Sequence, residues 1–78
     1  MKKHKIKVYS TQTCPYCTMA KDFIKKKGCK YEDFDVSTDK KAAKEAVAKS
    51  GQYGVPVIDI DGKVVIGFDQ DKIEELLN

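Results

Sequence analysis

The residues that most constrain the fold of this chain are Cys14-Pro15-Tyr16-Cys17, where two thiols meet the start of a helix. A short alternating run that ends at Ser10 precedes them, and apolar residues at i, i+3 and i+4 spacing follow. This pattern predicts a strand, a loop and then a helix. Proline suits the first helical position because its missing N–H would be unpaired there anyway. We therefore expect Cys14 at the N-cap of a helix that begins at Pro15.

A sulfur at an N-cap faces free backbone N–H groups and the positive end of the helix dipole. Both favour thiolate over thiol, so Cys14 is expected to be the attacking nucleophile. Cys17 lies in the first turn, where it could donate its N–H to that sulfur and close a disulfide with it, and it is the expected resolving thiol. Alternatively, the two cysteines could supply half of the ligands of a zinc site. A structural zinc usually takes four Cys or His ligands, and beyond this pair the chain offers only Cys29 and His4. We therefore expect no metal.

The length of 78 residues fits one domain, residues 1–78, near the small end of what a single core supports. The chain is 41% hydrophobic and 35% charged without low-complexity tracts, as soluble globular proteins are. Its longest apolar run, residues 64–66, is too short to span a membrane. Ile6-Lys7-Val8 interrupts what would be the apolar part of a signal peptide. We therefore expect a cytoplasmic protein.

Three cysteines, two of them in a C-x-x-C pair, do not form a disulfide framework. In a reducing compartment such a pair is more often catalytic or metal-binding. Cys29 is expected to be a bystander, with mixed-disulfide formation as its alternative role. The net charge of +3 comes from lysines that we place on solvated faces, and without arginine or an aromatic platform we expect no nucleic-acid partner.

Two helix signals flank a strand signal in the first two thirds of the chain. The helix from Pro15 should end at Lys27, before Gly28, and bury an apolar stripe: Tyr16, Met19, Ala20, Phe23 and Ile24. Within this stripe Tyr16 is expected to be half-exposed, because it stands between the cysteines. Residues 31–36 predict a strand. A second helix, capped within residues 37–39 and ending at Gly51, should pair Glu45 with Lys49 and turn inward Ala42, Ala43, Ala46 and Val47. This spacing makes the first two strands parallel.

The last third of the chain predicts a hairpin and a helix. Two strand signals, residues 57–60 and 63–66, are joined by Asp61-Gly62, which is typical of a type I′ turn. Asp69 should cap the last helix, with Phe68 and Ile73 packing across the cap. The element order is then β-α-β-α-β-β-α, with an antiparallel last pair of strands.

This element order, the C-x-x-C at the first strand-to-helix turn and a Val-Pro before the third strand together resemble the glutaredoxins, the small branch of the thioredoxin fold. The resemblance covers essentially the whole chain, and residues 14–17 match the dithiol glutaredoxin active-site sequence as they stand. It implies an α/β fold in which three helices flank a four-stranded mixed sheet. It also implies that Val55-Pro56 is the cis-proline segment, whose main chain pairs with a substrate peptide or glutathione.

By this resemblance, the protein is expected to be a monomeric thiol-disulfide oxidoreductase that reduces protein disulfides, glutathione mixed disulfides or both, with glutathione as co-substrate. The Cys14 thiolate would attack the substrate disulfide, and Cys17 would then release the reduced product. The residues implied to contact substrate or glutathione are Thr11, Thr13, Pro15, Tyr16, Val55, Pro56, Gly67, Phe68 and Asp69.

Two positions depart from the family pattern. The usual Lys or Arg three residues before the first cysteine is Thr11 here, and the usual Gly-Gly before the last helix is Gly67-Phe68. Both favour weaker or altered glutathione binding, although Lys21 could supply a substitute charge. Gly-Phe at this place is similar to redoxins that take electrons from thioredoxin reductase, which is one alternative. Others are a glutaredoxin that holds an iron–sulfur cluster through Cys14 and glutathione, and a redox-inert peptide-binding adaptor.

Overall fold

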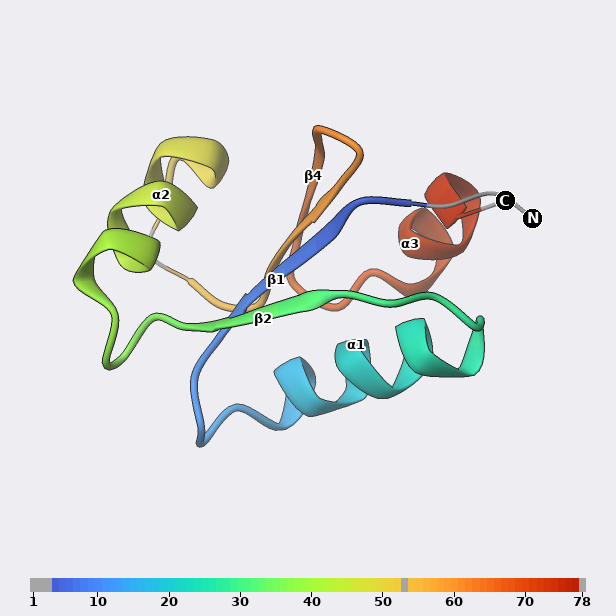
Figure 1. Cartoon of the computed structure of the whole chain (residues 1–78), viewed down its shortest axis with the longest axis horizontal. Helices are drawn as coiled ribbons and strands as arrows, with labels where there is room; N and C mark the ends of the chain where they lie inside the picture. The colour runs from blue at the N-terminus through green and yellow to red at the C-terminus, as the bar shows by residue number, and fades with distance from the viewer. Residues whose placement is uncertain (1–3, 53, 78) are drawn as a thin grey trace.

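The computed structural model describes residues 4–52 and 54–77. Seven elements follow one another in the predicted order (Figure 1): β1 (Ile6–Ser10), α1 (Pro15–Lys26), β2 (Glu32–Asp35), α2 (Lys40–Ser50), β3 (Val57–Ile60), β4 (Lys63–Ile66) and α3 (Gln70–Leu77). The predicted α/β fold, with a four-stranded mixed sheet and three helices, is confirmed. None of the helices in the described part of the chain combines the length and apolar character needed to cross a membrane.

The strands lie in the order β2-β1-β3-β4, which places β1 and β3 at the centre of the sheet. β1 pairs with β2 in parallel, as predicted, and with β3 antiparallel. β3 and β4 form the predicted hairpin, and Asp61 (φ 53°) and Gly62 (φ 89°) both take the positive φ that a type I′ turn requires. The Gly62 amide also donates to the Asp59 side chain at 2.8 Å.

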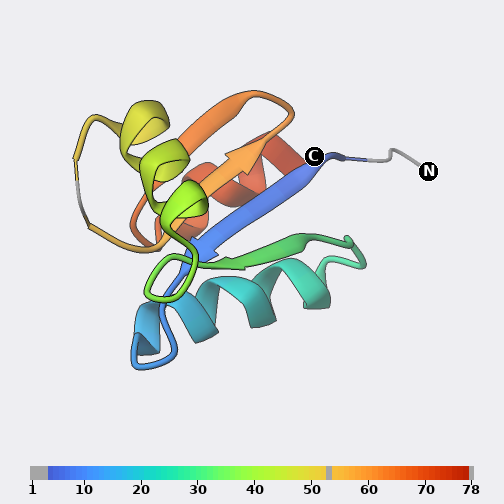
Figure 2. The same cartoon turned by 60° about the vertical axis from the view of Figure 1, so that its left-hand side comes forward.

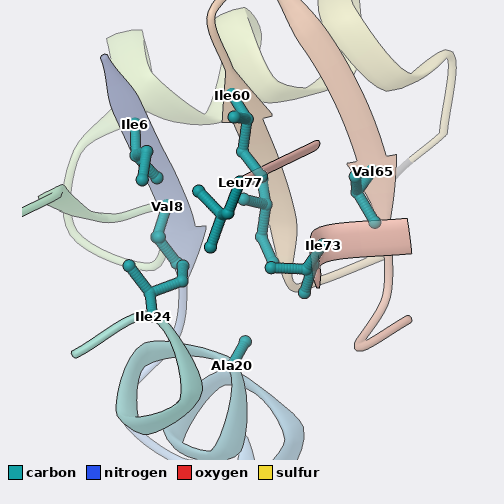
Figure 3. Packing of buried hydrophobic residues seen from close by; sticks show 9 residues of the cluster. Ile6, Val8, Ala20, Ile24, Ile60, Val65, Ile73 and Leu77 are labelled. Atoms are coloured by element: carbon teal, nitrogen blue, oxygen red, sulfur yellow. The ribbon is translucent and has the colours of Figure 1, made fainter. Parts of the chain in front are cut away.

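Helices cover both faces of the sheet, with α2 on the opposite face from α1 and α3 (Figure 2). Alternate residues of β1 therefore point into two cores, Val8 into one and Tyr9 into the other. Figure 3 shows the larger core, in which α1 and α3 pack on the sheet through Ile6, Val8, Ala20, Ile24, Ile58, Ile60, Val65, Ile73 and Leu77. The smaller core under α2 contains Tyr9, Ala42, Ala46 and Val57.

The helix ends agree with the local sequence signals. Asp39 is the N-cap of α2 and accepts the Ala42 amide at 3.1 Å, and Gly51 ends that helix in the left-handed region at φ 74°. Gly28 takes φ 77° just beyond α1. Because each cap depends on a few neighbouring residues, each could be predicted without knowing the tertiary structure.

The predicted buried stripe of α1 is wrong at Met19, which is 48% exposed. Tyr16 is 63% exposed. The helix turns Cys17, Ala20 and Ile24 to the sheet instead. Apolar residues at helical spacing form a stripe wider than the contact with the sheet, so those on its flank remain accessible.

A polar cluster joins α2 to the central strands. The buried Tyr9 hydroxyl donates to Glu45 at 2.7 Å, and the Lys49 ammonium donates to Tyr9 at 3.1 Å and to Asp59 at 2.6 Å. The predicted pair of Glu45 and Lys49 is present at 3.2 Å. Burial lowers the pKa of Lys49, but its hydrogen bonds to Asp59, Tyr9 and Glu45 outweigh that effect and hold the pKa above its ordinary value.

His4 connects the start of the described chain to two distant segments. One ring nitrogen lies 2.6 Å from the Asp61 carboxylate and the other 3.0 Å from the Leu77 carbonyl. The Lys5 amide also donates to Asp61 at 2.7 Å. These contacts fasten the hairpin turn and the end of α3 to the chain that leads into β1.

Candidate active site

Strand pairing brings three connecting segments to one end of the sheet. Tyr9 pairs with Val57, and Val57 pairs with Ile66. β1 and β4 therefore end, and β3 begins, at the same edge. The dithiol loop follows β1, residues 55–56 precede β3, and residues 67–68 follow β4. The register thus places the predicted substrate-contacting residues at one end of the molecule.

The two thiols of the C-P-Y-C sequence differ in access. Cys14 is the N-cap of α1, as predicted, and its sulfur accepts the Cys17 amide at 3.2 Å. Its carbonyl accepts the Thr18 amide at 3.3 Å, so the first turn closes around it. Cys14 is partly exposed, Cys17 is fully buried, and both are free thiols. A substrate disulfide can therefore reach the first sulfur but not the second.

The pKa of the Cys17 thiol is raised to about 12, and burial is the largest cause. The hydrogen bond with Cys14 contributes to this rise, and a hydrogen bond from the Thr11 backbone opposes it. At neutral pH, Cys17 is therefore a protonated thiol. The arrangement can perform two-step chemistry, in which the accessible sulfur reacts first and the buried sulfur reacts only with its neighbour.

The Val55-Pro56 peptide bond is cis, as predicted. Pro56 is buried and Val55 partly buried, and the Pro56 carbonyl accepts the Gly67 amide at 2.8 Å. Gly67 adopts φ 76°, a conformation that favours glycine. This hydrogen bond fixes the connection between β4 and α3 beside the proline.

The other predicted contact residues lie on the loops around the dithiol. Thr11 is partly buried and Thr13 is exposed. Asp69 is exposed and caps α3 by accepting the Lys72 amide at 3.2 Å. The Phe68 ring packs against the larger core, which contains Ile73, and meets the Phe23 ring edge-on at a centroid distance of 6.1 Å.

Lys21 belongs to a small polar network beside the dithiol helix. Its ammonium lies 3.0 Å from the Asp33 carboxylate and 3.4 Å from the Ser10 hydroxyl, and that hydroxyl donates to Asp33 at 2.9 Å. Lys21, which could have replaced the missing cation at position 11 in binding glutathione, is therefore already paired with Asp33 of β2. Sequence reasoning missed this partner because Asp33 is remote in the chain and no local signal links the two residues.

Among residues 4–52 and 54–77, no three or more His, Cys, Asp or Glu side chains are grouped so that they could hold a metal ion. A family model described as glutaredoxin matches residues 6–65, which is most of the chain and includes both cysteines of the C-P-Y-C sequence. The chain belongs to the glutaredoxin family.

Curated glutaredoxins cover most of the same length. A glutaredoxin-like 8.6 kDa protein of the Clostridium pasteurianum rubredoxin operon, itself uncharacterized, is 43% identical over 72 residues, which are 92% of this chain and 96% of that protein. Glutaredoxin 3 of Escherichia coli (strain K12) is 31% identical over 64 residues, which are 82% of this chain and 77% of that protein. By family, this protein is a glutaredoxin-like thiol oxidoreductase, and glutaredoxins in general use glutathione.

Solved glutaredoxin structures share the whole architecture. The glutaredoxin grx-1 of Archaeoglobus fulgidus has a TM-score of 0.87 at 29% identity, covering 95% of this chain and 86% of that one. The glutaredoxin-like NrdH-redoxin of Escherichia coli, described as having a thioredoxin-like activity profile, has a TM-score of 0.81 at 28% identity, covering 92% and 93% of the two chains. These similarities confirm the thioredoxin-like fold of this glutaredoxin.

Proposed function

We propose that this glutaredoxin is a dithiol thiol-disulfide oxidoreductase in which Cys14 is the nucleophile and Cys17 the resolving thiol. The observation that supports it is the accessible Cys14 sulfur at the N-cap of α1, held at 3.2 Å by the amide of the fully buried Cys17. The Cys17 amide and the positive end of the α1 dipole both face this sulfur. The chain would act as one domain and as a monomer.

The proposed reaction transfers two electrons from the dithiol to the substrate. The Cys14 thiolate attacks a substrate disulfide, forms a mixed disulfide and expels one substrate thiolate, which takes up a proton. Cys17 then loses its proton and attacks the Cys14 sulfur, which expels the second substrate thiolate. The protein is left with a disulfide between Cys14 and Cys17, and an external reductant returns it to the dithiol.

Glutathionylated substrates can follow a shorter route. Cys14 takes over the glutathione, and a second glutathione molecule removes it, so Cys17 is not needed. We propose that the main chain at Val55 and Pro56 and the rim formed by Thr11, Thr13, Pro15, Tyr16, Gly67, Phe68 and Asp69 hold the glutathione or peptide. The convergence of these three segments at one end of the sheet supports this site.

A second candidate differs in the electron donor. Thr11 brings no cation to the rim, Lys21 is paired with Asp33, and Phe68 occupies a place usually taken by glycine. These features favour a redoxin that is reduced by thioredoxin reductase. The similarity to a redoxin with a thioredoxin-like activity profile points in the same direction.

A coupled NADPH-oxidation assay on a small disulfide tests both candidates. One arm contains glutathione and glutathione reductase, the other thioredoxin reductase, and Cys14→Ser is the control in each. Turnover in the glutathione arm supports a glutathione-linked enzyme, and turnover only in the other arm supports the redoxin. Activity that persists in Cys14→Ser would contradict the assignment of the nucleophile.

A further inference from the structure

Apolar side chains continue from the dithiol along one flank of α1. Tyr16 and Met19 are three residues apart and are 63% and 48% exposed, and Phe23 follows one turn later. Phe68, from the connection between β4 and α3, meets Phe23 edge-on at 6.1 Å. An apolar strip therefore leads from the reactive sulfur towards the start of α3.

The strip opens into a groove of about 460 Å³. Its lining residues are Met19, Asp22, Phe23, Lys26, Phe68 and Gln70. Met19, Phe23 and Phe68 make its apolar part, and Lys26 lies at the end farther from the dithiol. The neighbouring Lys27 pairs with Glu74 at 2.8 Å, whereas in the described part of the chain we find no ion pair to Lys26. The groove thus combines apolar surface with one cation, Lys26, at its far end and one carboxylate, Asp22, a turn nearer the dithiol.

Building on the proposed function, we propose that this groove binds the segment of a protein substrate that flanks its reactive cysteine, with a large apolar side chain on Met19 and Phe23 and a carboxylate at Lys26. Glutathione is a small polar tripeptide and has no large apolar side chain to place there. A protein disulfide always brings neighbouring residues with it. Since the mixed disulfide anchors the substrate at Cys14, one of its two flanking segments can run along the groove.

Helix geometry sets the spacing that such a substrate needs. A rise of about 1.5 Å per residue places Asp22 and Phe23 about 12–14 Å along α1 from Cys14, and Lys26 about 18 Å from it. An extended peptide advances about 3.3–3.6 Å per residue. Four residues of extended chain span about 13–14 Å and six span about 20–22 Å, so an apolar residue four positions from the substrate cysteine reaches Phe23, and an acidic residue six positions away reaches the long Lys26 side chain. Both offsets are even, which puts the two side chains on the same side of an extended chain.

Seven-residue peptides test this spacing. Each carries an activated disulfide between its single cysteine and thionitrobenzoate, whose release upon attack by Cys14 is followed by absorbance. The best peptide has cysteine first, leucine fifth and glutamate seventh, and a reversed peptide with cysteine last covers the opposite direction. Replacing leucine with serine should slow the reaction about five- to tenfold, the effect of covering much of one leucine side chain. N-acetylcysteine amide with the same leaving group is the reference without flanking residues.

Matched protein variants assign the effect to the groove. Met19→Ser should remove most of the preference for leucine, and Lys26→Glu should reverse the preference for glutamate over lysine at the seventh position. Lys44→Glu makes the same charge change at an exposed position on α2, on the other face of the sheet, and should change neither preference. All three variants should react with the reference compound at the rate of the unchanged protein.

Three results would overturn the groove proposal. One is an equal rate for leucine and serine peptides in both directions, and another is a leucine preference that survives in Met19→Ser. The third is a dimer in sedimentation experiments that Met19→Ser dissociates, which would assign the surface to a second copy of the chain. The reference compound keeps these outcomes distinct from failure of the proposed function, because loss of its Cys14-dependent reaction would contradict the oxidoreductase itself.

Discussion

The amide of Cys17 donates to the sulfur of Cys14 at 3.2 Å while the Cys17 side chain is fully buried. One residue therefore holds the accessible sulfur through its backbone and keeps its own thiol behind that sulfur. The helix cap brings the two residues together before any disulfide forms. The resolving step thus needs a proton transfer and a short movement of sulfur rather than a rearrangement of the fold.

The two cysteines should be separable by substitution. Cys14→Ser should abolish reduction of both protein disulfides and glutathione mixed disulfides, because no accessible thiolate remains. Cys17→Ser should lose protein-disulfide reduction selectively and retain the glutathione route. Parallel turnover assays on an insulin-like disulfide and a glutathionylated peptide measure both effects. Equal loss in the two assays for Cys17→Ser would argue against separate roles.

The resolving step should accelerate with pH well beyond the range of an ordinary cysteine. Because burial raises the pKa of Cys17 to about 12, its thiolate fraction should grow about tenfold for each pH unit between roughly pH 6 and 9. Release of peptide from a preformed mixed disulfide at Cys14 measures this step directly. A plateau near pH 8.5, where a free cysteine is half ionised, would contradict the buried environment.

Lys49→Met should lower the free energy of unfolding by about 2–3 kcal/mol, because it leaves the largely buried Asp59 carboxylate without its cation. Urea denaturation measures the change. Lys44→Met on the exposed side of the same helix is the control and should change stability by less than about 0.5 kcal/mol. Similar losses in the two variants would show that the polar cluster does not stabilise the fold.

His4→Ala should lower the melting temperature near neutral pH, because the imidazole links Asp61 to the end of α3. The hydrogen bond from His4 lowers the pKa of Asp61. This stabilisation is therefore complete above the ordinary aspartate pKa of about 3.9 and is lost as the pH falls through the lowered value. Melting curves should thus converge in strong acid. Asp61→Asn should lower the melting temperature at neutral pH as His4→Ala does. Asparagine tolerates the positive φ of the turn, so this variant removes the carboxylate without straining the backbone.

Local signals predicted most of the elements. The caps at Cys14 and Asp39 and the turn at Asp61-Gly62 each depend on neighbouring residues, and the structure has all of them. The cis bond before Pro56 was predicted from the resemblance and from the rarity of cis bonds elsewhere. Apart from the cis bond, each of these features depends on a few neighbouring residues, so the local sequence is enough to predict it.

The predictions that were wrong, and the contacts that were not predicted, depend on tertiary structure. Met19 shares the spacing of Ala20 and Ile24, but only the position of α1 on the sheet decides which of them is covered. The pairing of Lys21 with Asp33 needs the parallel neighbours β1 and β2 in register. Chain spacing carries neither kind of information, and so the apolar groove beside the dithiol was not foreseen.

The register of β1, β3 and β4 also determines where the chain tolerates a change in length. One residue inserted or deleted within β3 would move Pro56 by about 3.3 Å relative to the dithiol loop and turn alternate side chains to the wrong face. Residues added after Gly62, at the far end of the hairpin, would leave that alignment intact. The β3–β4 turn is therefore the place to attach a probe or a surface anchor without disturbing the thiols.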